Sequence, residues 1–192
     1  MSTIHAWFCC CLSRCKKLRS GILPAALGAF LYGCAGYGGQ DLQPGKSTLQ
    51  DVHAAMGEPA LQWAEPDHSM QLSYPRGPAG YHSFMVYLDP AGRLQRIENV
   101  MDEASFYRIE PGMTEEQVLR ILGPSVPAWT NYFAARRELV WEWRYCNEFS
   151  QSARFDVLFD GDRHTVRTSY GTTEPCNQLT PCLCGRTVAS RP

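Results

Sequence analysis

The sequence predicts an α+β fold built from two tandem units, each with short helices packed on a three-stranded antiparallel sheet. The first observation behind this prediction is an internal repeat. The segments Leu42–Pro59 and Ile109–Pro124 share a Pro-Gly pair, a threonine, a valine four residues later and a glycine five residues beyond the valine. The second observation is that three strand-like runs follow each segment. A unit of about 60 to 65 residues, used twice, accounts for most of the chain.

Each unit begins with a helix that has start and stop signals. A threonine hydroxyl at the N-cap accepts a hydrogen bond from the first turn, and a carboxylate or amide three residues later completes a capping box. Glycine ends a helix because it adopts the left-handed conformation at low cost. These positions are Thr48, Asp51 and Gly57 in the first unit and Thr114, Gln117 and Gly123 in the second. Apolar residues at helical spacing between them predict one buried face in each helix.

Three runs with alternating apolar and polar residues follow each helix, as expected of strands with one face on the core. They are Met70–Tyr74, His82–Leu88 and Arg93–Asn99 in the first unit, and Val140–Arg144, Ala153–Phe159 and Thr165–Ser169 in the second. The turn-forming segments Asp89–Gly92 and Asp160–Asp162 join the last two runs of each unit as hairpins. Asp102–Ile109 predicts an additional short helix before the second unit.

Residues 1–33 are predicted to be an export signal. The first 20 residues hold four basic residues and no acidic ones, and an apolar run of eleven residues follows. This order is typical of a signal peptide, and the run is shorter than the roughly 20 residues that a helix needs to span a bilayer. The ending Leu-Tyr-Gly-Cys34 resembles the lipobox of bacterial lipoproteins, in which the cysteine carries a covalent lipid. The alternative is an ordinary signal peptide cut near Gly33, with Cys34 left free.

The repeat and the signal together predict the domain organisation. The segments are an export signal at 1–33, a lipidated linker at 34–41, the two units at 42–100 and 101–171, and a cysteine-rich tail at 172–192. The signal holds four of the 18 basic residues and none of the 19 acidic ones, so the mature chain has 14 basic residues, 19 acidic residues and a net charge near −5. No basic stripe is present, which argues against nucleic acid as a partner.

Four cysteines of the mature chain, Cys146, Cys176, Cys182 and Cys184, are candidates for two disulfides in an oxidising compartment. A ring closed between Cys182 and Cys184 would be strained, so we expect Cys146 and Cys176 each to pair with one of these two cysteines. Both such pairings are open. A zinc site of four thiolates is the competing interpretation, but the gap between Cys146 and Cys176 does not fit the usual ligand spacing.

The order of motif residues resembles the BamE (SmpA/OmlA) lipoprotein domain, in two tandem copies. Its residues are Gly112, Thr114, Val118, Leu122 and Gly123 in the helix, and Trp141, Trp143, Phe159 and Asp160 in the sheet. Pro124 stands one position earlier than in the family pattern. The resemblance implies an envelope lipoprotein, and the best-known member is an accessory subunit of the machine that inserts β-barrel proteins into the outer membrane. The tandem architecture is also similar to that of secreted β-lactamase inhibitors.

The sequence predicts a binding protein rather than an enzyme. It has no G-x-S-x-G or H-E-x-x-H motif, and we expect no cofactor apart from the lipid on Cys34. The glycines and prolines of the 74–80 segment predict either a loop that displays Tyr74 and Arg76 to a partner or a plain stiff connection between two strands. Trp141 and Trp143 share one face of their strand, which favours a place in the core, although tryptophans are also enriched at interfaces.

The predicted location is the periplasmic face of the outer membrane. Ala35 follows the lipidated cysteine, where an aspartate would resemble an inner-membrane retention signal. The expected partners are the membrane, through the anchor, and envelope proteins such as subunits of the β-barrel assembly machinery. The alternative function is a protein inhibitor of a periplasmic enzyme.

Overall fold

The computed structural model describes residues 39–77, 79–175 and 183–184. The chain divides into two compact parts, Met1–Gly33 and Cys34–Pro192, and every described residue belongs to the second part, which holds both repeats. The predicted export signal and the predicted lipid attachment at Cys34 lie outside the described residues. Cys176 and Cys182 also lie outside them.

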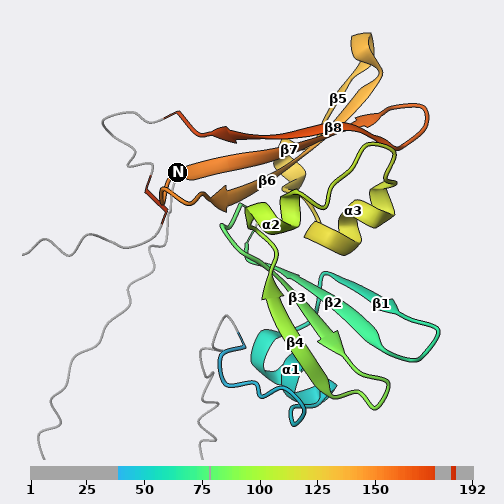
Figure 1. The fold of residues 1–192 in the computed structure, drawn as a ribbon, viewed down its shortest axis with the longest axis vertical. Coiled ribbons are helices and arrows are strands. Elements are labelled where there is room, and N and C mark those ends of the chain that lie inside the picture. The colour runs from blue at the N-terminus through green and yellow to red at the C-terminus, as the bar shows by residue number, and fades with distance from the viewer. Residues whose placement is uncertain (1–38, 78, 176–182, 185–192) are drawn as a thin grey trace, which may run out of the picture. The chain divides into compact units, whose positions relative to one another are not determined.

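Two four-stranded antiparallel sheets and a few short helices make up the fold, so the prediction of an α+β class is confirmed (Figure 1). The first module contains α1 (Leu49–Met56), β1 (Leu61–Ala64), β2 (Met70–Pro75), β3 (Ser83–Leu88) and β4 (Leu94–Asn99). The second module contains α2 (Glu103–Phe106), α3 (Glu115–Leu122), η1 (Pro127–Trp129), β5 (Asn131–Phe133), η2 (Ala134–Arg136), β6 (Glu138–Cys146), β7 (Ser152–Asp160) and β8 (Val166–Thr173). In each sheet the strands lie side by side in chain order.

The prediction of three strands in each module was wrong, because one short strand was missed at the edge of each sheet. β1 has four residues and pairs with β2, and β5 has three residues and pairs with β6. Strands this short show too few alternations for a period of two to be recognised. All three residues of β5, Asn131, Tyr132 and Phe133, are exposed, so no position marks a buried face.

The helix signals form as the sequence predicts. Thr114 Oγ1 accepts a hydrogen bond from the Gln117 N–H at 3.3 Å, and the Thr114 N–H donates to Gln117 Oε1 at 2.8 Å. α1 has the equivalent reciprocal pair between Thr48 and Asp51. The predicted helix after the first module is present as α2, whose N-cap is Asp102.

α1 packs on one face of the first sheet and forms a core of its own with it. Val52 and Met56 of the helix contact apolar residues that alternate along the strands: Leu72, Tyr74, Val86, Leu88 and Leu94. Val52, Leu72 and Val86 are fully buried. The spacing of these residues in the sequence therefore accounts for this layer of the fold.

α3 contacts both sheets, although it belongs to the second repeat. Val118, Ile121 and Leu122 pack with inward-facing residues of the second sheet and with Met85 of β3, all in one core. Gln71 of β2 donates a hydrogen bond from Nε2 to the carbonyl oxygen of Arg120 at 2.6 Å. Figure 1 shows α2 and α3 between the two sheets. The face of the first sheet opposite to α1 is thus covered by a helix of the other repeat.

Gly123, at the end of α3, allows this close approach. A Cβ atom at this position would lie 2.4 Å from Ser73 Oγ, and the backbone has a φ of 74°. Its carbonyl oxygen accepts a hydrogen bond from Trp143 Nε1 at 3.2 Å. Gly123 is therefore held between a strand of the first sheet and a strand of the second, where any side chain would collide.

A disulfide joins Cys146, at the end of β6, to Cys184. Their Cα atoms are 5.5 Å apart, and 38 positions separate the two residues along the chain. The Cys184 N–H also donates to the Ser150 carbonyl oxygen at 3.0 Å, and Leu183 forms a β-bridge with Gln151. This bond is one of the two alternatives that the sequence leaves open for Cys146, and it ties the tail to the β6–β7 hairpin.

Candidate functional site

The outer face of the second sheet, which we define as the face opposite to α2 and α3, is the candidate site. Both faces of the first sheet are covered, one by α1 and the other by α3. The inner face of the second sheet carries buried apolar residues, among them Trp143, Phe155, Val157 and Phe159. Within the described part of the chain, no α-helix covers the outer face (Figure 1). The 3-10 helix η1 contributes Trp129 to this face.

The strand register brings charged side chains together on the outer face. Glu142 pairs with Asp156 across β6 and β7, and the next outward-facing pair is Arg144 with Arg154. Arg154 donates from Nη1 to Glu142 at 2.9 Å and from Nε to Glu174 at 3.1 Å. Arg144 donates from Nη2 to Glu174 at 2.6 Å. The residues form a chain of ion pairs in which carboxylates alternate with arginines.

These side chains line a groove of about 660 Å³, which we call the sheet groove. Its other walls include Trp129, from η1, and Tyr170, from β8. The Arg154 guanidinium carbon lies 3.8 Å from the centre of the Trp129 ring, within the range of a cation–π interaction. Tyr170 is 49% exposed and pairs with Asp156 in the register of β7 and β8. Aromatic and charged groups therefore stand side by side in the groove.

Asp156 is the carboxylate that this network leaves unsatisfied. Its Oδ1 atom is buried and accepts no hydrogen bond from any of the described residues. Burial, together with the charge of Glu142, raises the pKa of Asp156 to about 6, against the opposing effect of Arg154. The described residues that line the groove include three carboxylates and two guanidinium groups, which together have a formal net charge of −1 at neutral pH. The groove therefore favours a cation.

Replacing Asp156 with asparagine is expected to raise the free energy of unfolding at pH 7 by about 1 kcal/mol, after allowance for the partial exposure of this side chain to solvent. The folded protein binds the Asp156 proton more tightly than the unfolded chain does, so stability falls as pH rises from about 4 to about 6. The variant should lack this part of the pH dependence and match the parent below pH 4. Urea unfolding between pH 3.5 and pH 7.5 measures it; equal curves for parent and variant would contradict the expectation.

Of the partner-binding candidates, Trp141 and Trp143 lie in the core, as their shared strand face favoured, whereas Tyr74 does not lie where it was predicted. The prediction that Tyr74 stands on an exposed loop was wrong: it lies in β2, two residues after Leu72, and is buried against α1. Burial raises the pKa of its hydroxyl to about 12. Trp143 is buried in the core of the second module, and Trp141 packs against the same core. None of these three residues lies in the sheet groove.

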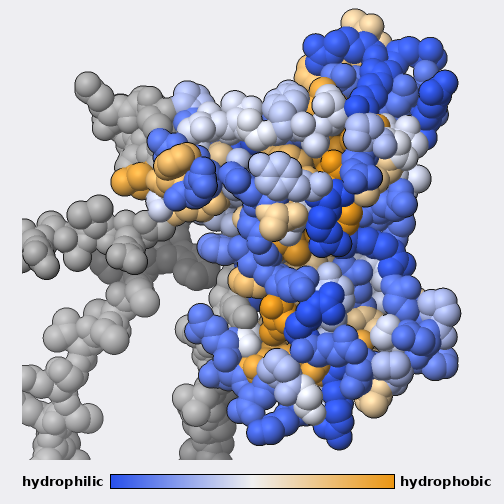
Figure 2. Space-filling view, viewed as in Figure 1, coloured by the Kyte–Doolittle hydropathy of each residue, from blue (hydrophilic) through white to orange (hydrophobic). Residues whose placement is uncertain are grey.

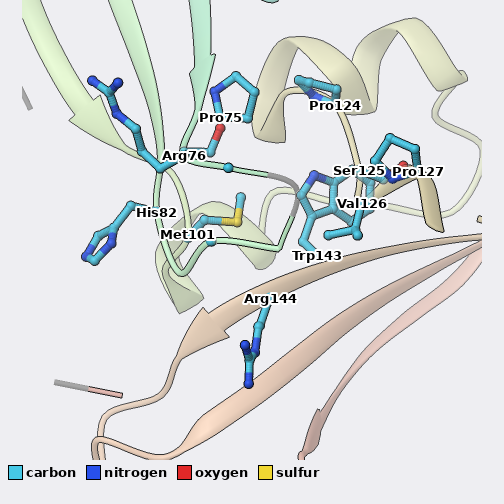
Figure 3. Close-up of a pocket in the computed structure, with 13 residues that line it drawn as sticks. Pro75, Arg76, His82, Met101, Pro124, Ser125, Val126, Pro127, Trp143 and Arg144 are labelled. Atoms are coloured by element: carbon cyan, nitrogen blue, oxygen red, sulfur yellow. The ribbon is translucent and has the colours of Figure 1, made fainter. Parts of the chain in front are cut away.

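Arg76 lines a second cavity, of about 290 Å³, which we call the loop cavity. Its apolar walls come from the loops after β2 and α3, together with Met101 and Trp143. Figure 3 shows Arg76, His82 and Arg144 directed away from these apolar residues. The Arg76 guanidinium lies 5.3 Å from the centre of the Phe84 ring. The loop cavity therefore offers apolar walls without a charged group pointing inward, so its lining indicates less about a ligand than that of the sheet groove.

The residues of the sheet groove were not predicted from the sequence. The sequence signal for the groove is a pair of opposite charges two positions apart on each of two neighbouring strands. These pairs are Glu142 with Arg144 and Arg154 with Asp156. That pattern is also typical of an ordinary solvated strand face. Only the register and the place of Trp129 show that these positions enclose a groove.

Comparison with known proteins gave no match to a family model, to a curated protein or to a solved structure. The likeness to BamE domains therefore stays a prediction. Within residues 39–77, 79–175 and 183–184, no three His, Cys, Asp or Glu side chains are grouped so that they could hold a metal ion. No helix of the described chain is long and apolar enough to cross a bilayer. The residues in Figure 2 are mostly hydrophilic on the face it shows, with hydrophobic residues visible between them.

Proposed function

We propose that the protein is a non-catalytic lipoprotein of the outer membrane, anchored through Cys34 and facing the periplasm, and that it binds an envelope protein through the outer face of the second sheet. The observation that carries the binding role is the sheet groove, which lies on the sheet face that none of the described α-helices covers. The export signal and the Leu-Tyr-Gly-Cys34 ending support the anchor.

The composition of the sheet groove supports a protein partner. Tryptophan, tyrosine and arginine are the residues most enriched where binding energy concentrates at protein interfaces, and Trp129, Tyr170 and Arg154 all line the groove. Ion pairs already hold Arg154 and Arg144 in place, which lowers the entropy that a partner would lose on ordering them. The resemblance to BamE domains suggests subunits of the β-barrel assembly machinery as the first partners to test.

Capture from membranes tests the binding surface. The tagged full-length protein is extracted in mild detergent, and the proteins that co-purify are identified by mass spectrometry. We expect Tyr170→Ala to lower recovery of the partner by about tenfold, because it removes an exposed aromatic from the groove. Tyr107→Ala is the matched control, since Tyr107 is 82% exposed and lies outside the groove.

The outcomes of this capture separate the two candidate functions. Recovery of barrel-assembly subunits that depends on Tyr170 supports the proposal. Recovery of a single soluble periplasmic enzyme in a tight pair would instead support an inhibitor. Equal recovery by the parent and the Tyr170→Ala variant would rule out the outer face as the binding surface.

The anchor has a separate test. Metabolic labelling with a radioactive fatty acid should label the parent protein, and Cys34→Ala should lose the label and move to the soluble periplasmic fraction. An unlabelled parent, or a variant that stays with the membrane, would exclude the anchor and the location that depends on it.

A further inference from the structure

We infer that the sheet groove receives a basic side chain of the protein partner, an arginine or a lysine, with Asp156 as its counter-ion. This inference rests on the proposed function, because it names the chemistry by which the outer face recognises its partner. It concerns one row of residues across three strands: Glu142 on β6, Asp156 on β7 and Tyr170 on β8.

Charge balance in the groove supports a cationic ligand. Among the described residues of the groove, two guanidinium groups, of Arg144 and Arg154, face three carboxylates, of Glu142, Asp156 and Glu174. The ion pairs engage both arginines with Glu142 and Glu174. The carboxylate of Asp156 is in none of the ion pairs formed within the described chain, so a positive group brought by a partner would complete the alternation of charges. An acidic ligand would instead add to the excess of negative charge.

The poor solvation of Asp156 indicates that a cation would bind most favourably next to this carboxylate. Oδ1 is shielded from water and makes no hydrogen bond with the described residues, while the side chain as a whole remains partly exposed on the groove wall. An ionised carboxylate in this position has lost hydration without gaining a donor, which is costly. A guanidinium or ammonium group at the exposed side would offset that cost with a charge-assisted hydrogen bond.

Tyr170 supplies the second part of the recognition. Its ring is half-exposed and stands beside Asp156 on the neighbouring strand, so one cation can contact the carboxylate and the ring face together. The groove already contains such an arrangement, since Arg154 stacks on Trp129 and pairs with Glu142. The groove volume of about 660 Å³ is ample for the end of an arginine side chain.

A titration with short peptides tests this chemistry on the full-length protein in detergent. The probe is the capped tripeptide Gly-Arg-Gly, and the comparison is Gly-citrulline-Gly, which has nearly the same shape without the charge. We expect the arginine peptide to shift the NMR amide signals of β7 and β8, with a dissociation constant on the order of 1 mM, and the citrulline peptide to bind at least about tenfold more weakly. Equal binding of the two peptides, or equal binding of Gly-Glu-Gly, would overturn the inference.

Variants assign the binding to Asp156. Asp156→Asn keeps the size of the side chain and should weaken the arginine peptide by about tenfold. Asp41→Asn is the matched control, because Asp41 is exposed and lies outside the groove, and it should leave binding unchanged. The urea unfolding described above shows whether Asp156→Asn remains folded. If Asp156→Asn bound the arginine peptide as the parent does, another group would have to be the counter-ion.

The pH dependence gives a further readout. The groups that face Asp156 are Glu142 from β6, Arg154 on its own strand and Tyr170 from β8, with Arg144 and Glu174 in the adjoining row. Protonation of Asp156 removes the counter-ion, so binding of the arginine peptide should weaken between pH 7 and pH 5, and the Asp156→Asn variant should show little of this change. The same pH dependence in both proteins would contradict the inference.

The capture experiment distinguishes the inference from the proposed function. If Tyr170→Ala loses the partner and Asp156→Asn does not, the outer face binds the partner but the basic side chain is excluded. If neither variant loses the partner, the proposed surface itself fails. A protein truncated after Cys184 that bound the arginine peptide tenfold more tightly than the full chain would show that the chain's own C-terminal residues occupy the groove, and would overturn a partner side chain as its occupant.

Discussion

Leu122→Ala is expected to lower the free energy of unfolding by about 3 to 5 kcal/mol, because it removes a fully buried side chain from the core that both sheets share. Leu122 packs in the same cluster as Met85 of the first sheet and Phe159 of the second. The cavity should therefore destabilise both modules together. Urea unfolding followed by tryptophan fluorescence and by far-UV circular dichroism should give one coincident transition at a lower midpoint.

Leu119→Ala is the matched control for this change. Leu119 lies on the same helix but is only partly buried and is outside the shared core, so its truncation should cost about 1 kcal/mol. Two separate transitions in the Leu122→Ala variant, with the amide protons of β2 and β3 protected as in the parent, would mean that the modules unfold independently. That result would contradict the role assigned to α3.

Removing the disulfide is expected to lower the free energy of unfolding by about 2 to 4 kcal/mol. The bond closes a loop of 38 positions between Cys146 and Cys184, and it restricts the unfolded chain accordingly. The double variant Cys146→Ala/Cys184→Ala avoids leaving a free thiol that could pair with another cysteine. Chemical unfolding of the oxidised parent and of the double variant measures the difference.

Reduction supplies the control for the disulfide. If the Cys146–Cys184 bond dominates the contribution of the cysteines, the reduced parent and the double variant should unfold at similar urea concentrations. Loss of the disulfide should also alter the structure of the sheet groove, because Cys146 follows Arg144 by two residues on the outer face. A double variant as stable as the oxidised parent would show that the bond does not stabilise the folded protein.

The features that sequence predicted correctly are local ones. Thr114, Gln117 and Gly123 determine the ends of α3 through contacts with residues three or four positions away, so no tertiary information was needed. The two-sided packing of α3 was not predictable in this way. The sequence shows a single apolar stripe, made of Val118, Ile121 and Leu122. This stripe gives no indication that Met85 of the other repeat packs against it.

The sheet groove could not be predicted from the sequence for a related reason. Glu142, Asp156 and Tyr170 are each 14 residues apart in the sequence and become neighbours only through the register of three strands. The glycine-rich loop after β2 is more conspicuous in the sequence, but Tyr74 is not part of it, because Leu72 and Tyr74 alternate as inward-facing strand residues. Burial of Tyr74 follows from that alternation, whereas the groove depends on pairings between distant segments.

Because the two sheets share a helix, we expect that the sequence repeat does not fold as an independent unit. A fragment ending at residue 100 would keep α1 and every strand of the first sheet, yet Gln71, Ser73 and Met85 would face water where α3 had covered them. Such a fragment should be prone to associate through that bare side. We therefore expect that deleting either half, or exchanging it for another domain, will destabilise the remaining half unless the replacement supplies a helix of matching shape.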